Sequence, residues 1–217
     1  KDEQLSKALN QFGMMPLPPY IKRPNGNLKT DNTDYQTTFA NCDGAIAAPT
    51  AGLHFTPSLV DKLKAKGIRF ATLTLHVGAG TFLPIKVKNV DDHCMHSEWG
   101  EINSSCAEVI NTTRNNGGRV IAIGTTTLRL LETAADADGK IKPFKGETCI
   151  FITPGYKFKV TDKLITNFHL PKSTLFMLVA AFSGLSQMHN AYKHAIKNKY
   201  RFYSYGDACL LDKQKVK

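Results

Sequence analysis

The sequence contains 217 residues, of which 42% are hydrophobic and 21% are charged, so it matches a folded domain and excludes a disordered chain. One main domain is expected, because a domain typically takes about 100–200 residues. No stretch approaches the roughly 20 apolar residues of a membrane span, and the N-terminus lacks the apolar region of a signal peptide. We therefore expect a cytoplasmic protein with no membrane contact. The five cysteines are scattered without a C-x-x-C pair, which indicates reduced thiols and argues against a zinc ribbon.

Positive charge dominates, with a formal net charge of +10, and the excess is greatest near the C-terminus. This pattern predicts either attraction of a polyanion or a lysine-rich surface facing water, and charge alone does not distinguish the two. The basic residues concerned are Lys193, Lys197, Lys199, Arg201, Lys213, Lys215 and Lys217.

The first residues predict a helix over residues 2–12, ended by Gly13, and then a proline-stiffened connector. Beyond Gly44, short apolar runs alternate with helical stretches, which is typical of an α/β domain with parallel strands. The expected strands are residues 45–49, 68–77, 96–102, 119–123, 149–153 and 164–166. The expected helices are residues 57–66, 105–115, 128–135, 173–182 and 188–199.

Two of the helix starts carry capping signals. Thr56 and Pro57 supply an N-cap and a first-turn proline, and Ser105 with Glu108 forms a capping-box pattern. Because both signals precede apolar periodicity, they fix where these helices are expected to begin.

In α/β architectures the loops at the carboxyl ends of the strands carry ligand sites, because helix N-termini present free amides there. Polar and glycine-rich residues of this sequence gather in five such loops, which predicts one site built from several loops. The loops are residues 50–54, 76–81, 124–127, 153–156 and 166–169.

Two of these loops are rich in glycine or threonine. The turn HVGAGTF lacks the third glycine of a dinucleotide fingerprint, so it indicates close backbone approach, in either a structural turn or a ligand contact. The Gly-Thr-Thr-Thr turn at residues 124–127 places hydroxyls and free amides at a helix start, with Arg129 one turn on. It suits a carboxylate, a ribose or a phosphate, and simple N-capping is the alternative.

Histidines and one glutamate are candidates for proton transfer. His96 and Glu98 are two residues apart in an expected strand, so they share a face, either as acid and base or as mere surface neighbours. His54, His76 and His169 each stand where a strand is expected to end. A structural role is the better interpretation for any one of them, whereas three in equivalent positions favour a shared site.

The sequence lacks the residue patterns that several other enzyme chemistries require. There is no G-x-S-x-G nucleophile elbow, and the His-x-Glu of the sequence lacks the P-C-x-x-C that zinc deaminases require. No spacing of histidine and glutamate supports a metal site, so none is expected.

Eight long motifs follow one another over nearly the whole chain. They are MPLPPYIKR (residues 15–23), DYQTTFA (34–40), GAIAAPTAGLHFT (44–56), LTLHVGAGTFLPI (73–85), MHSEWGEI (95–102), VIAIGTTTLRLLE (120–132), IFITPGYKFKVTDKLITNFHLPKSTLFML (150–178) and AYKHAIKNKYRFYSYGDACLL (191–211). In sequence and order they resemble the family of S-adenosylmethionine:tRNA ribosyltransferase-isomerases of queuosine biosynthesis.

The resemblance implies that S-adenosylmethionine is a ribosyl donor, consumed as a substrate, and that no cofactor is needed. The ribosyl group would join the aminomethyl arm of 7-aminomethyl-7-deazaguanine at the tRNA wobble position, giving epoxyqueuosine and releasing adenine and methionine. A base must remove a proton next to the sulfonium, an acid should assist adenine departure, and the attacking amine must be neutral.

We expect Glu98 and His96, with His54 or His169, to share this proton transfer. Residues expected to bind the substrate are Thr50, Gly52, His76, Gly78, Gly80, Gly124, Thr125, Thr126, Arg129 and Asn167. Residues expected to bind tRNA are Lys199, Arg201, Tyr203 and Tyr205, where aromatic faces combine with positive charge. A packed corner between helix and strand is the alternative for this last group.

The resemblance also implies a barrel-like α/β domain with parallel strands and surrounding helices, into which a small all-β domain is inserted. We expect residues 1–22 to be the end of the inserted domain and its connector, and residues 23–217 to be a catalytic domain, in a monomer. Because the sequence starts with lysine and matches the family from the end of the inserted domain onward, we expect it to lack the family's N-terminal part.

Two other functions are weighed. One is an inactive, truncated remnant that still binds S-adenosylmethionine or RNA, which predicts binding without turnover. The other is a conventional methyltransferase, which needs an acidic residue at the end of its second strand. The second expected strand ends at His76 and Val77, which disfavours the methyltransferase.

Overall fold

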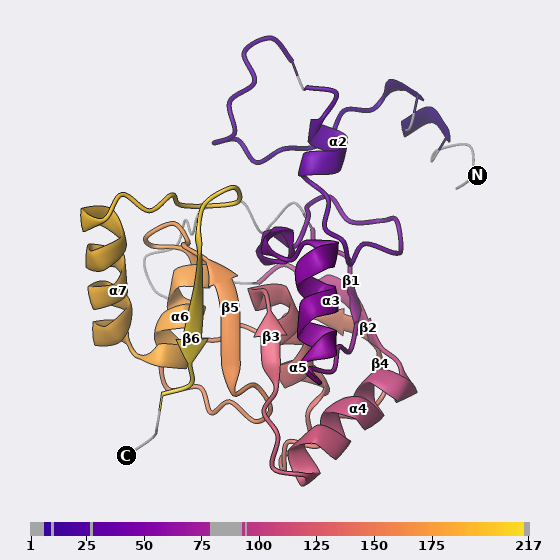
Figure 1. Ribbon diagram of the computed structural model, residues 1–217, viewed down its shortest axis with the longest axis vertical. Coiled ribbons are helices and arrows are strands. Elements are labelled where there is room, and N and C mark those ends of the chain that lie inside the picture. The colour runs from indigo at the N-terminus through magenta and orange to yellow at the C-terminus, as the bar shows by residue number, and fades with distance from the viewer. Residues whose placement is uncertain (1–6, 10, 27, 79–92, 94, 215–217) are drawn as a thin grey trace.

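A computed structural model of the protein describes residues 7–9, 11–26, 28–78, 93 and 95–214. Within these residues the strands form two sheets of three, and helices pack against both sheets (Figure 1). The chain is therefore a mixed α/β protein, as the sequence predicts.

The first sheet is antiparallel throughout and has the order β1-β2-β4. Its strands are β1 (Thr74–Leu75), β2 (Glu98–Ile102) and β4 (Phe144–Thr148). Gly100 in β2 lies against the Leu130 side chain, and a Cβ there would stand 2.7 Å from Leu130 Cδ1. The missing side chain thus lets helix α5 (Thr125–Ala134) pack directly on the sheet.

The second sheet combines a parallel and an antiparallel pair. Strand β3 (Ile121–Ile123) runs parallel to β5 (Lys163–Asn167), and β6 (Ala208–Asp212) runs antiparallel to β5. The carboxyl ends of β3 and β5 therefore meet at one edge, and the Gly124 amide donates to the Ile165 carbonyl at 2.8 Å there. This edge is the place where the α/β pattern predicts a site.

Beyond residue 30, seven helical segments accompany the sheets within the described residues. They are α2 (Asp31–Asp34), the 3₁₀ helix η1 (Thr50–His54), α3 (Pro57–Ala65), α4 (Ser104–Asn115), α5, α6 (Thr174–Ser183) and α7 (Leu185–Lys197). Figure 1 shows α6 and α7 beside β6, and the segment that contains α2 extending at one end of the molecule. The element order thus keeps helices between the strands, as the alternating pattern indicates.

The capping signals give one confirmation and one correction. Thr56 caps α3, because its hydroxyl accepts from the Leu59 amide at 3.2 Å. The capping box predicted at Ser105 and Glu108 is wrong, since Asn103 is the N-cap of α4 and accepts from the Cys106 amide at 2.8 Å. An asparagine two residues earlier fulfils the same requirement, so the helix begins one residue before Ser105.

One hydrophobic core joins both sheets to α4, α5, α6 and α7. Its fully buried side chains include Leu128, Leu130, Leu164, Val179, Phe182 and Met188. Helix α5 contacts strands of both sheets, and α6 contacts both α7 and β6. The threonines at the start of α5 are consequently held by a rigid element, which favours precise placement of a ligand.

The expected strands agree only in part with those observed. The runs at residues 45–49 and 149–153 form no strand, although Ala47 and Ile152 are buried. An apolar run shows only that a segment is buried, and a turn after residue 153 keeps the second run out of the ladder. Only Thr74 and Leu75 of the strand expected at residues 68–77 pair.

The prediction of mainly parallel strands is wrong for the described residues, where only β3 and β5 pair in parallel. Strands β4 and β6 were not expected from the sequence, and each pairs in an antiparallel way with an expected strand. Alternation of strands and helices along the chain does not determine which strands become neighbours. The described strands form two separate sheets rather than one closed barrel.

The expected helices are present with shifted ends. Helix α5 starts at Thr125 instead of residue 128, so the threonine turn is itself the first turn of the helix. Helix α7 starts at Leu185 and follows α6 after Gly184. Of the helix expected at residues 2–12, residues 7–9 and 11–12 are helical, and the rest lies outside the described residues.

Candidate active site

A cavity of about 370 Å³ lies at the edge where β3 and β5 end, which is within the size range of small-molecule sites. Its walls come from six segments that are separated in the sequence. Lining residues include Tyr20, Ala47, Thr50, Val77, Gly124, Thr125, Thr126, Asn167, His169, Lys172, Ser173, Leu175, Tyr203 and Ser204. The loops expected at residues 50–54, 124–127 and 166–169 meet at this cavity, as does Val77 of the loop expected at residues 76–81.

The first turn of α5 forms one wall. Gly124 is the N-cap with φ +91°, a conformation that side-chain-bearing residues rarely adopt, and no side chain caps this helix end. The amides of the first turn have no partners within the helix itself, and Thr125 and Thr126 line the cavity beside them. The wall therefore offers both N–H donors and hydroxyls to a ligand.

Asn167, at the end of β5, holds the opposite wall together and is only 4% exposed. Its Oδ1 lies 3.1 Å from Thr50 Oγ1, and its Nδ2 lies 3.2 Å from His54 Nε2. The same Nδ2 donates to the Ser204 carbonyl at 3.4 Å. One buried amide thus joins η1, β5 and the segment before β6.

His54 lies behind Thr50 and does not line the cavity. Its pKa is lowered below the ordinary histidine value, chiefly by desolvation, with Asp207 raising it and Arg201 lowering it further. His54 therefore tends to be neutral at neutral pH, with its Nε2 facing Asn167.

His169 lines the cavity, and its Nε2 lies 2.9 Å from Thr166 Oγ1. Its backbone is held by Tyr192, whose hydroxyl lies 2.7 Å from the His169 amide and 3.2 Å from its carbonyl. Desolvation lowers the pKa of His169 to about 4. The imidazole is consequently neutral at neutral pH, and it can accept a proton only weakly.

Two tyrosines form an aromatic wall. The rings of Tyr20 and Tyr203 have centroids 5.0 Å apart, and Tyr20 OH bonds to Ser204 Oγ at 2.7 Å. Tyr203 has φ +70°, which is rare for a bulky residue and turns the chain at this wall. Such a wall suits a planar base, because every nucleobase has a π face.

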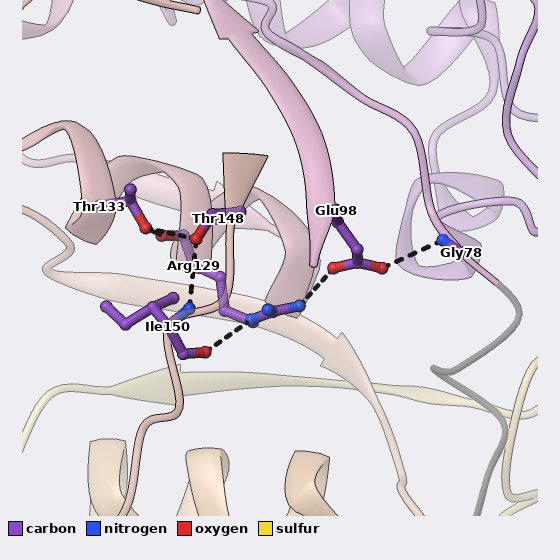
Figure 2. Close-up of polar contacts among 6 residues, drawn as sticks. All are labelled: Gly78, Glu98, Arg129, Thr133, Thr148 and Ile150. Atoms are coloured by element: carbon purple, nitrogen blue, oxygen red, sulfur yellow. Dashed lines mark hydrogen bonds and ion pairs between the residues drawn. The ribbon is translucent and has the colours of Figure 1, made fainter. Parts of the chain in front are cut away.

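Glu98 and Arg129 form a buried ion pair beside this site, with side chains that are 3% and 6% exposed (Figure 2). Glu98 also accepts from the Gly78 amide at 3.3 Å, and Arg129 Nε donates to the Ile150 carbonyl at 3.2 Å. The pair therefore links β2, α5 and two loops. This arrangement gives Arg129 a structural partner, and its expected contact with substrate stays a prediction.

His96 and Glu98 do not share the face of a strand, so this prediction is wrong. Strand β2 begins at Glu98, which is buried, whereas His96 precedes it and is exposed. The register of β2 points Glu98 toward α5, and nothing in the described residues brings His96 to the cavity. The acid and base roles expected of these two residues stay predictions.

The remaining expected substrate residues lie in packing positions. His76 stacks near Trp99 with centroids 5.2 Å apart, and its amide donates to the Trp99 carbonyl. Gly52 is buried, and a Cβ there would stand 3.0 Å from Thr37 Cγ2, so its small size is needed for packing. Gly80 lies outside the described residues.

The four residues expected to bind tRNA divide into two groups. Tyr203 lines the cavity. The side chains of Lys199, Arg201 and Tyr205, which are close to Tyr203 in the sequence, are exposed. Arg201 pairs with Asp207 at 3.4 Å, and Tyr205 meets Tyr35 edge to face. Both interpretations of this segment, a tRNA contact and a packed corner between helix and strand, stay open, because the segment has a packed side and an exposed side.

Sequence reasoning missed several lining residues. Tyr20 belongs to the proline-rich connector, and Lys172 and Ser173 form the turn before α6. For Tyr20, the available signal in the sequence was its position directly after a rigid Pro-Pro pair. Lys172 could have been suspected from its place at a helix start next to His169.

Within the described ranges no helix is long and apolar enough to cross a membrane. In the same part of the chain, no group of three or more histidine, cysteine or acidic side chains is arranged to hold a metal ion.

The fold defines a mixed α/β protein with a cavity of ligand size at the ends of two parallel strands. The family described as queuosine biosynthesis protein matches residues 1–211, so the chain belongs to this family. The chain spans about three fifths of the length of the curated relatives that it matches, as their coverage of 58% and 60% shows.

Two of these relatives, both named S-adenosylmethionine:tRNA ribosyltransferase-isomerase, are similar over most of this chain. The protein of Nitrobacter winogradskyi is 60% identical over 95% of this chain, and that of Sphingopyxis alaskensis is 62% identical over 97%. The crystal structure of S-adenosylmethionine tRNA ribosyltransferase from Thermotoga maritima is also similar. It has a TM-score of 0.61 and 43% identity, and the match covers 74% of this chain and 50% of that one.

Proposed function

We propose that this chain carries the donor-binding part of an S-adenosylmethionine:tRNA ribosyltransferase-isomerase. The reaction transfers the ribosyl group of S-adenosylmethionine to 7-aminomethyl-7-deazaguanine at the tRNA wobble position and rearranges it to epoxyqueuosine. Adenine and methionine are released, and S-adenosylmethionine is consumed rather than recycled as a cofactor. The observation that carries the proposal is the family match over residues 1–211, together with a ligand-sized cavity at the strand ends.

The composition of the cavity supports a nucleoside as the ligand. Tyr20 and Tyr203 offer aromatic faces for a base, and hydroxyls of Thr50, Thr125 and Thr126 are placed for polar groups of a ribose. No carboxylate lines the cavity, and Lys172 is its one permanently charged side chain among the described residues. Lys172 therefore offers a cation to the methionine carboxylate of the donor.

His169 is the best-placed group for proton transfer, because it lines the cavity and is neutral. His54 lies farther from the cavity than His169 and acts on it through Asn167. Glu98 is paired with Arg129, so it can reach a substrate only if that pair opens. We therefore assign the proton from the carbon next to the sulfonium first to His169, which is a weak base because its pKa is about 4, and keep Glu98 as the second candidate.

We further propose that the exposed segment with Lys199, Arg201 and Tyr205 contacts the anticodon arm. Positive side chains attract the phosphates, while Tyr203 at the cavity lets one base leave the stack and enter the site. The barrel-like closure that the family resemblance implies would then require residues beyond the two described sheets.

The experiment that tests the proposal measures adenine release from S-adenosylmethionine, with tRNA that carries 7-aminomethyl-7-deazaguanine and with unmodified tRNA. Release that depends on the modified base, with epoxyqueuosine in the digested nucleosides, is the expected result. Binding of S-adenosylmethionine without release would favour the alternative, a remnant that binds but does not turn over. Formation of S-adenosylhomocysteine with methylated tRNA as the product would contradict the proposal.

A further inference from the structure

Behind the cavity wall, the orientation of the Asn167 amide is determined by its neighbours. Its nitrogen end faces the Ser204 carbonyl at 3.4 Å, and a carbonyl oxygen can only accept a hydrogen bond. Rotating the amide by half a turn would set two oxygens against each other in a buried place, since Asn167 is 4% exposed. The Nδ2 group must therefore face Ser204 and also His54 Nε2.

Two consequences follow for the partners of this amide. Because Nδ2 donates to His54 Nε2, that nitrogen must be unprotonated, and the proton of the neutral imidazole stays on Nδ1. Because Oδ1 can only accept, the Thr50 hydroxyl must use its hydrogen for Asn167. The side of Thr50 Oγ1 that faces the cavity then offers lone pairs only.

We propose that Asn167 is a positioning residue that makes Thr50 a hydrogen-bond acceptor for a ligand in the cavity and holds His54 in the Nδ1–H form. The ligand group that Thr50 recognises is a neutral N–H or O–H donor. This inference rests on the proposed function for the identity of the ligand, but its hydrogen-bond part concerns residues of this chain alone. Asn167 itself accepts from Thr50 at Oδ1 and uses both hydrogens of Nδ2 for His54 and Ser204.

Two groups on the substrates of the proposed reaction are donors of this kind. One is a ribose hydroxyl of S-adenosylmethionine, and the other is the neutral amine of 7-aminomethyl-7-deazaguanine. The oxygen of Thr50 carries no full charge, so it does not select an ammonium group over a hydroxyl by charge. It does reject a ligand group that can only accept a hydrogen bond, because the lone pairs of that group would then face those of the Thr50 oxygen. The wall thus selects for donor groups whichever substrate reaches it.

The hydrogen-bond part is tested by long-range proton–nitrogen correlation spectra of the chain with ¹⁵N-labelled histidine, in which His54 is assigned with the His54→Gln variant. The expected spectrum shows His54 with a protonated Nδ1 and a bare Nε2. In Asn167→Asp the carboxylate accepts instead of donating, so the proton is expected on Nε2. Arg201 and Asp207, the charged groups that affect His54, are unchanged in this variant, and the new carboxylate at position 167 is the one added charge.

Asn198→Asp is the matched control, because Asn198 Nδ2 faces His194 Nδ1 at 3.3 Å on the exposed end of α7. It should leave the His54 signals unchanged. A protonated Nε2 in the unsubstituted chain would overturn the inference even if Asn167→Asp fails to fold. An unchanged tautomer in folded Asn167→Asp would overturn it as well.

The ligand part is tested by titration calorimetry with S-adenosylmethionine and, separately, with free 7-aminomethyl-7-deazaguanine. Thr50→Val, which removes the acceptor, is expected to weaken one of the two by roughly tenfold, whereas Thr50→Ser keeps most of the affinity. The weakened compound identifies the donor as the ribose hydroxyl or the amine. The control Thr113→Val removes a hydroxyl on α4 that donates to the Val109 carbonyl, and should change neither affinity.

Equal binding of both compounds by Thr50→Val and the unsubstituted chain would overturn the role of Thr50. If the unsubstituted chain bound neither compound, the proposed function would fail together with the ligand part. The nitrogen spectra would then still decide the role of Asn167, so the two failures are distinguishable.

Discussion

At the scale of single residues, buried polar side chains of this protein are held by several partners at once. Asn167 joins three segments through one amide, and Glu98 joins Arg129 to the Gly78 amide. Glu132 in α5 is 1% exposed and accepts from three successive amides, those of Lys159, Val160 and Thr161. Each of these side chains gives a hydrogen-bond partner to backbone groups of an adjoining loop that no strand or helix pairs. Buried polar groups need such partners.

The Glu132 carboxylate predicts a measurable contribution to stability. Glu132→Ala leaves three buried amides without their acceptor and is expected to lower the free energy of unfolding by roughly 3 kcal/mol. Urea unfolding followed by circular dichroism measures the change. The control Glu147→Ala removes an exposed carboxylate that accepts only from Ser97 Oγ, and should change the stability by less than about 0.5 kcal/mol. Similar values for the two variants would contradict the role assigned to Glu132.

His169 predicts a pH dependence of stability. Its folded pKa, about 4, lies below the ordinary value of 6.5, so the unfolded chain binds the proton more readily. Its contribution is fully present above about pH 6.5 and is lost as the pH falls toward 4, with a slope of at most about 1.4 kcal/mol per pH unit. Unfolding at pH 7.5, 6.0 and 5.0 should show a shallower decline in His169→Gln. His189→Gln, at an exposed histidine, should decline as steeply as the unsubstituted chain.

At the scale of elements, helix starts are determined by local chemistry, and those of α3, α4 and α6 were predicted to within one residue, whereas α5 and α7 start three residues earlier than predicted. Thr56 before Pro57, and Ser173 before α6, cap the helices that follow them. The exception is α4, where Asn103 fulfils the requirement that the sequence pattern assigned to Ser105. Both residue types are good N-caps, so the pattern alone could not decide between them.

The corrected cap of α4 predicts different effects of two neighbouring substitutions. Asn103→Ala removes the acceptor of the Cys106 amide and is expected to lower the stability by about 1 kcal/mol. Ser105→Ala removes only a hydroxyl that bonds to Asn103 Oδ1, and should lower it by a few tenths of that amount. Thermal unfolding of both variants measures the difference. A larger loss in Ser105→Ala would restore the capping box.

At the scale of the whole molecule, the sequence predicted the α/β class and the meeting of loops at the strand ends. It did not predict the sheets, because strand pairing depends on contacts between segments far apart in the chain. Strand β4, with the sequence Phe-Lys-Gly-Glu-Thr, carries weak strand propensity and is held by its ladder to β2. The aromatic wall was likewise hidden, since Tyr20 and Ser204 are joined across 184 residues of chain.

The basic surface makes a prediction about the partner of the whole molecule. If Lys199 contacts a tRNA phosphate, Lys199→Ala should weaken tRNA binding and lower the salt slope of the logarithm of the affinity by about 0.7 to 0.9. Filter binding between roughly 50 and 200 mM salt measures this slope. Lys145→Ala, which removes a lysine of the first sheet that pairs with Glu101, is the control and should keep the slope. Equal slopes for all three proteins would exclude Lys199 from the interface.

The most direct test of the central claim, that the cavity at the ends of β3 and β5 holds the ribosyl donor, is a crystal structure of the chain with S-adenosylmethionine. The account predicts the donor between Thr50, Gly124 and Asn167, with its adenine against Tyr20 or Tyr203. A donor bound at any other place, with this cavity empty, would contradict it.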